Sequence, residues 1–260
     1  MRRLIRVSIA GPVLLAVILS AMVLAAGASA TTAVTIGQTF SSALFCTQAY
    51  VVQTGAPDYV VPSGTWSISS WSTNAGPDGG SMSLMVFEPT TTPGSYTVVG
   101  ESPVESLTAS SLNTFTLTTP IAVQGGDLLG MWEAGADCNV DSGGTILYEL
   151  STPEPAVGAT VTPPQSQVSD LNISATLTPT VEGHLATLLA AVTGVGSGKS
   201  LAAKVTQIQM YVGAGDTANA CSSLTAFTNE VNAQAGKKIR AAQAASLLAQ
   251  AQVIEAGLGC

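Results

Sequence analysis

The sequence predicts a jelly-roll-like, antiparallel β-sandwich followed by a small all-α bundle of three or four helices. Residues 31–180 contain many short runs rich in Thr, Ser and Val, separated by Gly- and Pro-containing turns. Residues 184–260 are rich in Ala and Leu and repeat their apolar residues at helical spacing. The charge changes at the same place: residues 31–183 contain thirteen Asp and Glu but no Lys or Arg. These observations divide the chain into an acidic β-sandwich domain and a helical bundle domain.

Residues 1–30 have the three parts of a secretory signal peptide. Arg2, Arg3 and Arg6 precede an uncharged apolar run, and Ala28-Ser29-Ala30 is a small-x-small cleavage site. An uncleaved anchor is the alternative, because residues 7–26 are nearly long enough to span a bilayer. We expect cleavage, secretion or attachment at the cell surface, and no contact of the mature chain with the membrane.

The acidic domain is expected to contain roughly nine or ten strands. In the run SMSLMVF, Met82, Leu84 and Val86 share one face of a strand. The segments NAGPDGG and TTTPGS mark turns, and Gly125-Gly126-Asp127 is expected to close a hairpin. This number of short strands favours a jelly roll of about 150 residues.

The helical domain follows the dipeptide Thr178-Pro179. Gly213, Gly215 and Gly236 interrupt its apolar pattern, and Asp216 is placed to cap a helix. Four stripes at a spacing of 3.6 residues predict the helices: Leu185, Leu188, Leu189 and Val192; Leu201, Val205, Ile208 and Val212; Ala220, Leu224, Phe227 and Val231; Leu247, Leu248, Ala251, Ile254 and Leu258.

Four cysteines predict two disulfides, as is usual for an even number in an exported chain. Three pairings are possible. The division into two domains favours Cys46–Cys138 in the sandwich and Cys221–Cys260 in the helices. No two cysteines have C-x-x-C spacing, so the sequence indicates neither a redox motif nor a zinc site.

The segment GVGSGKS, residues 194–200, is similar to the end of a phosphate-binding loop. The full motif needs a glycine at position 193 and a preceding strand, but Thr193 follows an expected helix. We therefore expect no nucleotide and interpret the segment as a connector. The absence of Lys and Arg from residues 31–183 also argues against nucleic acid as a partner.

One loop, EAGADCNVDSGG, is a candidate calcium site. Asp137, Asn139 and Asp141 alternate as oxygen donors would, although the glutamate that ends a full calcium loop is missing. A polar hairpin loop without a metal is the alternative. Apart from calcium, no cofactor is expected.

Trp71 and Tyr59 are the candidate ligand-binding residues, because aromatic rings stack on sugars in carbohydrate-binding sandwiches. Trp71 departs from the alternation of Trp66 and Ile68 and precedes the loop STNAGPDGG. Packing in the core or at its rim is the alternative.

Catalysis has little support in the sequence. His184 is the only histidine, and no G-x-S-x-G motif is present. A pair from the carboxylates Glu133, Asp137, Asp141 and Glu149 could hydrolyse a glycosidic bond, but only 5% of the chain is aromatic. We assign no catalytic residue.

The segment from Gly198 to Cys260 resembles the FIMAH-type domain, a C-terminal helical module of exported bacterial proteins. The matching features are SLAAK, the turn Gly215-Asp216-Thr217, Cys221, AFTNEVNAQAGKK and the terminal GLGC. The usual FIN is replaced by Phe227-Thr228-Asn229. The resemblance implies an accessory role at or outside the cell surface and brings no catalytic residues.

These features predict an exported, non-catalytic protein for binding, adhesion or association with the cell envelope. The expected partner is a glycan or another envelope component, bound by the β-sandwich. The alternatives are a small carbohydrate-active enzyme of the glycoside hydrolase kind and a purely structural surface protein.

Overall fold

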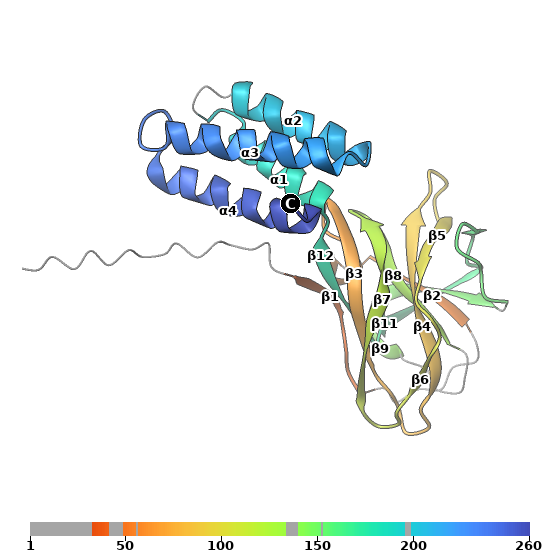
Figure 1. Ribbon diagram of the computed structural model, residues 1–260. Coiled ribbons are helices and arrows are strands. Elements are labelled where there is room, and N and C mark those ends of the chain that lie inside the picture. The colour runs from red at the N-terminus through yellow and green to blue at the C-terminus, as the bar shows by residue number, and fades with distance from the viewer. Residues whose placement is uncertain (1–32, 42–48, 56, 134–139, 152, 196–198) are drawn as a thin grey trace, which may run out of the picture.

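The computed structural model describes residues 33–41, 49–55, 57–133, 140–151, 153–195 and 199–260 (Figure 1). Two antiparallel sheets come first, and four helices follow them. The expected signal peptide lies outside the described residues. So do Cys46 and Cys138, and their predicted disulfide stays a prediction.

The smaller sheet has four strands in the order β1-β12-β3-β7. Its members are β1 (Val34–Gln38), β12 (Ile173–Pro179), β3 (Thr65–Asn74) and β7 (Leu112–Gln124). Side chains alternate between buried and more exposed positions along β12, as expected for a sheet with one face on a core. The first and the last strand of the β-region are therefore neighbours.

The larger sheet has eight strands in the order β10-β5-β4-β8-β2-β9-β11, and β6 also pairs with β4. Its members are β2 (Ala49–Thr54), β4 (Gly80–Pro89), β5 (Tyr96–Glu101), β6 (Glu105–Leu107), β8 (Leu128–Glu133), β9 (Val140–Ser151), β10 (Thr160–Val161) and β11 (Gln165–Leu171). A single-turn helix, η1 (Pro57–Tyr59), follows β2.

The predicted jelly roll is wrong. A jelly roll divides eight strands between two sheets by Greek-key connections, whereas here eight strands join one sheet that curls into a half-barrel. Strand β4 shows the physical reason, because all six residues from Met82 to Phe87 are buried. Because both faces of β4 are covered, the expectation that each strand buries only one face is wrong for this strand.

Two apolar cores lie on opposite faces of the large sheet. Met82, Leu84 and Val86 belong to the core shared with the small sheet, which includes Ile68 and Leu177. The opposite face carries a second cluster: Val52, Met85, Phe87, Tyr96, Val98 and Leu128. Apolar side chains of the large sheet are therefore packed on both of its faces.

The helices are α1 (Val181–Val192), α2 (Lys199–Gly213), α3 (Thr217–Gln234) and α4 (Ala241–Leu258). Residues from all four predicted stripes form one shared core. Asp216 is the N-cap of α3 and accepts a hydrogen bond from the Asn219 amide, as predicted. The predicted Cys221–Cys260 disulfide is confirmed, with Cα atoms 5.8 Å apart.

The helices start directly from the small sheet. Thr180 caps α1, and its amide donates to the carbonyl of Thr65 in β3 over 3.2 Å. A Cβ atom on Gly183 would lie 2.5 Å from that same carbonyl oxygen. Only a glycine lets α1 approach β3 this closely. Among the described residues, the structure contains no helix of the length and apolarity that a membrane span needs.

Candidate functional site

The two aromatic residues predicted to bind a ligand are buried. Tyr59 and Trp71 are each 1% exposed, so neither ring has a face on which a sugar could stack. The Tyr59 hydroxyl donates to the carbonyl of Leu171 over 2.6 Å, and burial is the main cause that raises its pKa. The Trp71 ring packs 4.6 Å from that of Phe115. The prediction of ligand contact is therefore corrected to the packing alternative.

A β-bulge explains the position of Trp71. Against β12, Ile68 pairs with Leu177 and Ser70 pairs with Thr176, so Ser69 is an extra residue in β3. One extra residue reverses which side chains of the strand face the core. Ile68 and Trp71 are consequently both buried, although they are three residues apart in the same strand.

The candidate calcium site lies mostly outside the described residues. This holds for Asp137 and Asn139, and only the backbone of Asp141 is described, opposite Asp170 in β11. Within the part of the chain that the structure describes, no three His, Cys, Asp or Glu side chains are grouped to hold a metal ion. Calcium at this loop stays a prediction.

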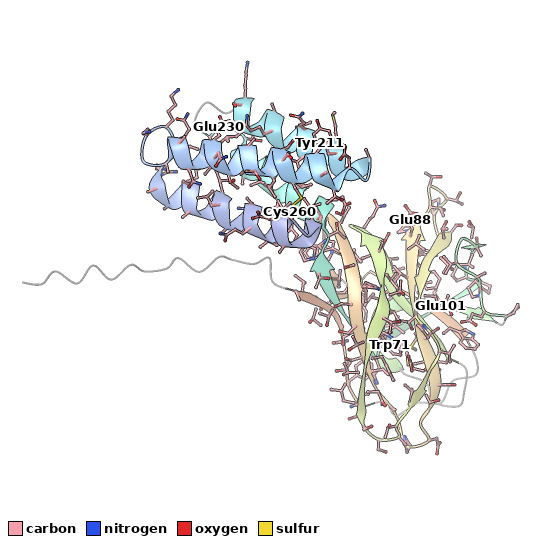
Figure 2. The ribbon with its side chains drawn as sticks, viewed as in Figure 1. Trp71, Glu88, Glu101, Tyr211, Glu230 and Cys260 are labelled. Carbon is pink, nitrogen blue, oxygen red and sulfur yellow. A yellow bond between two sulfur atoms is a disulfide. The ribbon has the colours of Figure 1, made fainter. Side chains whose placement is uncertain are left out.

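A groove of about 440 Å³ runs between β5 of the large sheet and β7, the edge strand of the small sheet. Strand β5 supplies one wall and strand β7 the other, and Figure 2 labels Glu101 on the β5 side. Gly100 allows the two strands to approach, because a Cβ atom there would collide with Ile121. The lining comprises Val99, Gly100, Glu101, Pro103, Glu105, Thr116, Leu117, Thr118, Thr119, Pro120, Ile121, Ala122 and Val157.

The groove combines an apolar floor with polar walls. Leu117 and Ile121 are buried beneath it, whereas Thr118 and Thr119 are exposed along β7. Its charged residues, Glu101 among them, are all acidic. Hydroxyl groups both donate and accept hydrogen bonds, and carboxylates accept them. The groove therefore offers hydrogen bonds of both kinds next to an apolar surface, but no cation.

A pair of carboxyl groups lies beside this groove. The Glu101 side chain contacts that of Glu154, which belongs to the connection between β9 and β10. The pKa of Glu101 is raised to about 7: burial is the largest cause, the Glu154 carboxyl adds to the rise, and the Ser83 hydroxyl opposes it. One oxygen of Glu154, Oε1, is buried and accepts no hydrogen bond from any of the described residues. Two such groups in contact are most stable when they share one proton.

We expect the stability of the protein to fall as the pH rises from about 4.5 to about 7, because of Glu101. The pKa of this carboxyl is higher in the folded state, so the folded state binds the proton more tightly and loses this advantage when the proton leaves. In the variant Glu101→Gln, the side chain at this position stays uncharged at every pH in this range. Its melting temperature should equal that of the wild type near the lower pH and exceed it above the higher one.

Thermal unfolding followed by circular dichroism across this pH range provides the measurement. Glu105→Gln is the matched control, since it removes one carboxylate from the same groove without touching the Glu101–Glu154 pair. Equal pH dependence of melting in the wild type and in Glu101→Gln would contradict the assignment of the proton to this pair.

A second pocket, of about 240 Å³, lies where the sheets meet the helices. Trp66, Glu88, Asp127 and Glu182 are among its lining residues. Asp127 has a structural task, because its Oδ2 accepts from the Gln124 amide over 2.7 Å and closes the β7–β8 hairpin. Burial raises the pKa of Asp127, and the nearby Glu88 adds to the rise. The predicted turn at residues 125–127 is confirmed.

Of the residues considered for catalysis, Glu133 and His184 do not line the groove, whereas Asp137 and the side chains of Asp141 and Glu149 lie outside the described part of the chain. Glu133 is buried in β8 opposite Met82 and is 2% exposed. His184 lies in the first turn of α1, and burial lowers its pKa. Sequence reasoning overlooked Glu101 and Glu154, because they stand in unrelated segments, YTVVGE and TPEP. Only the fold brings these two residues together.

Comparison with known proteins found no family model that matches the chain and no curated protein with significant similarity to it.

Proposed function

We propose that this chain is an exported, non-catalytic binding protein of the cell envelope, and that the groove between β5 and β7 holds its ligand. The Cys221–Cys260 disulfide supports an oxidising compartment, because such bonds persist mainly outside the cytoplasm. The resemblance of the helices to the FIMAH-type domain supports an accessory role at the cell surface.

The groove itself carries the proposal. Its volume of about 440 Å³ falls in the range of small-molecule sites, and its walls belong to strands that the sheets hold in place. Threonine hydroxyls and carboxylates lie beside an apolar floor, an arrangement that suits a hydroxyl-rich ligand such as a glycan. An anionic ligand fits poorly, because residues 31–183 contain no Lys or Arg.

The alternative of a glycoside hydrolase gains no support from Glu101 and Glu154. Glycosidase carboxyls stand about 5–5.5 Å apart in retaining enzymes and about 6.5–9.5 Å apart in inverting ones. The two carboxyls here are in contact and compete for one proton. A glycosidase instead needs two separate carboxyl groups, one protonated to act as the acid and one ionised to act as the base or nucleophile.

Removing the hydroxyl groups from the groove should weaken glycan binding. We expect the double variant Thr118→Val/Thr119→Val to bind at least about tenfold more weakly, which corresponds to about 1.4 kcal/mol. The ligand would first be identified on an array of bacterial envelope glycans, and its affinity then measured by titration calorimetry. Valine keeps the shape and the strand propensity of threonine but donates and accepts no hydrogen bond.

Thr114→Val is the matched control, because Thr114 is exposed on the same strand but does not line the groove. It should leave the affinity unchanged. If the array shows no glycan that binds, or if the double variant binds as the wild type does, the groove is not a glycan site. In that case, a purely structural role at the cell surface describes this protein better than ligand binding does.

A further inference from the structure

The positive charges of the described chain are gathered at one end of the helices. Lys199 is the first residue of α2, and Lys204 follows in its second turn. The other three cations, Lys237, Lys238 and Arg240, lie in the turn between α3 and α4. We call these five residues the basic tip.

The contacts of Glu230 show that the two groups of cations share one end of the bundle. Lys204 forms an ion pair with Glu230 near the end of α3, with an N–O distance of 3.2 Å. The Ser200 hydroxyl donates to the same carboxylate over 2.9 Å. The start of α2 therefore lies beside the end of α3, and the α3–α4 turn follows directly. Figure 2 labels Glu230 at the end of the bundle remote from Cys260.

Most of this positive charge is not neutralised. Glu230 balances one of the five cations, and Lys237 donates to the carbonyl of Ala233 at the end of α3. Lys199, Lys238 and Arg240 are exposed and have no acidic partner among the described residues. The basic tip thus keeps a surplus of positive charge on a protein whose formal net charge is −8.

The basic tip cannot reach the acidic surface of its own molecule. The 18 residues of α4 span about 27 Å between the tip and the β-region. The far end of α4 lies against the start of α1, because a Cβ atom on Gly257 would lie 2.8 Å from Val181. Figure 1 shows the C-terminus beside β12 and the α3–α4 turn at the opposite end. Charge interactions are screened over about 8–10 Å at physiological salt.

We propose that the basic tip docks on the acidic β-region of a second copy of this chain. The complementary charge is present in every molecule, since Asp58, Asp78 and Glu88 are exposed on the β-region and residues 31–183 contain no Lys or Arg. The contact joins two different surfaces, so repetition of it builds a head-to-tail assembly, either a closed ring or an open chain. This inference does not depend on the proposed role of the groove.

Sedimentation velocity of the purified full chain tests the proposal. At about 0.1 M salt, the weight-average sedimentation coefficient should rise with protein concentration, and at about 1 M salt it should return to the monomer value. The variant Lys238→Gln/Arg240→Gln should raise the apparent dissociation constant at least about tenfold. The conservative variant Lys238→Arg/Arg240→Lys should associate as the wild type does.

Gln207→Glu/Gln252→Glu is the matched control for net charge. It changes the net charge by the same amount as the tip variant, but at exposed positions on α2 and α4 away from the tip, so association should persist. A monomer at all concentrations in about 0.1 M salt would overturn the proposal. Equal weakening of the association by Lys238→Gln/Arg240→Gln and by Gln207→Glu/Gln252→Glu would also overturn it. Tip-dependent cosedimentation with phosphatidylglycerol vesicles, without self-association, would identify an anionic surface as the partner instead.

Discussion

The variant Cys221→Ser/Cys260→Ser is expected to lower the free energy of unfolding of the helical region by about 4 kcal/mol. The disulfide joins positions 39 residues apart, and closing a loop of this length restricts the unfolded chain. The apolar core of a region of about 75 residues supplies only a few kcal/mol of stability. The loss of the disulfide is therefore large compared with the total. Thermal unfolding followed at helix-sensitive wavelengths should show an earlier helical transition.

Reductant provides the control for this experiment. The double serine variant should no longer respond to reductant at its helical transition, whereas the wild type should move towards the variant. The variant is preferable to reduction alone, because the predicted Cys46–Cys138 disulfide would also be reduced. Helices that melt at the same temperature in the variant and in the wild type would show that the bond adds no stability.

Trp71→Ala is expected to destabilise the β-region by about 4 kcal/mol. The side chain is fully buried between the two sheets, and its removal leaves a cavity that the surrounding strands cannot fill. Chemical denaturation followed by circular dichroism gives the free energy of unfolding. A residue that served only as a surface platform for a ligand would show almost no loss.

Trp66→Ala is the matched control for this prediction. Trp66 is only partly buried and its Nε1 donates to the carbonyl of Pro62 over 2.9 Å, so its loss should cost clearly less. Equal losses for the two tryptophans would contradict the distinction that burial makes between them.

The helices and their disulfide were predictable because the information is local. Each stripe repeats within one segment, and buried residues such as Leu188, Val205 and Phe227 fall where the spacing places them. Asp216 caps its own helix through a neighbour three residues away. The helices also have little freedom in how they meet, because short turns such as 235–240 join them.

The pairing of the strands was not predictable from the same kind of pattern. Alternation reports that a strand exists but not which strand lies beside it. One signal was present and was not used: Leu84-Met85-Val86-Phe87 is a continuous apolar run, which is typical of a strand covered on both faces. The bulge at Ser69 had no signal in the sequence, and it turned Trp71 inwards.

The candidate groove depends on pairing even more strongly. Glu101 and Glu154 meet only because residues 158–161 run along β5 and bring the preceding loop with them. No spacing within either segment indicates this contact. A site built from strands that are distant in the sequence can be recognised only after the order of the strands in the sheets is known.

The pairing of β1 with β12 has a consequence for how the chain folds. Val34 pairs with Leu177, so the small sheet cannot be completed until almost the whole β-region is available. Contacts between such distant residues close large loops and slow the folding reaction. The helices contain mainly local contacts and can form on a much shorter time scale. We therefore expect two separate refolding phases, in which the last residues of the chain acquire their structure before the first strand docks.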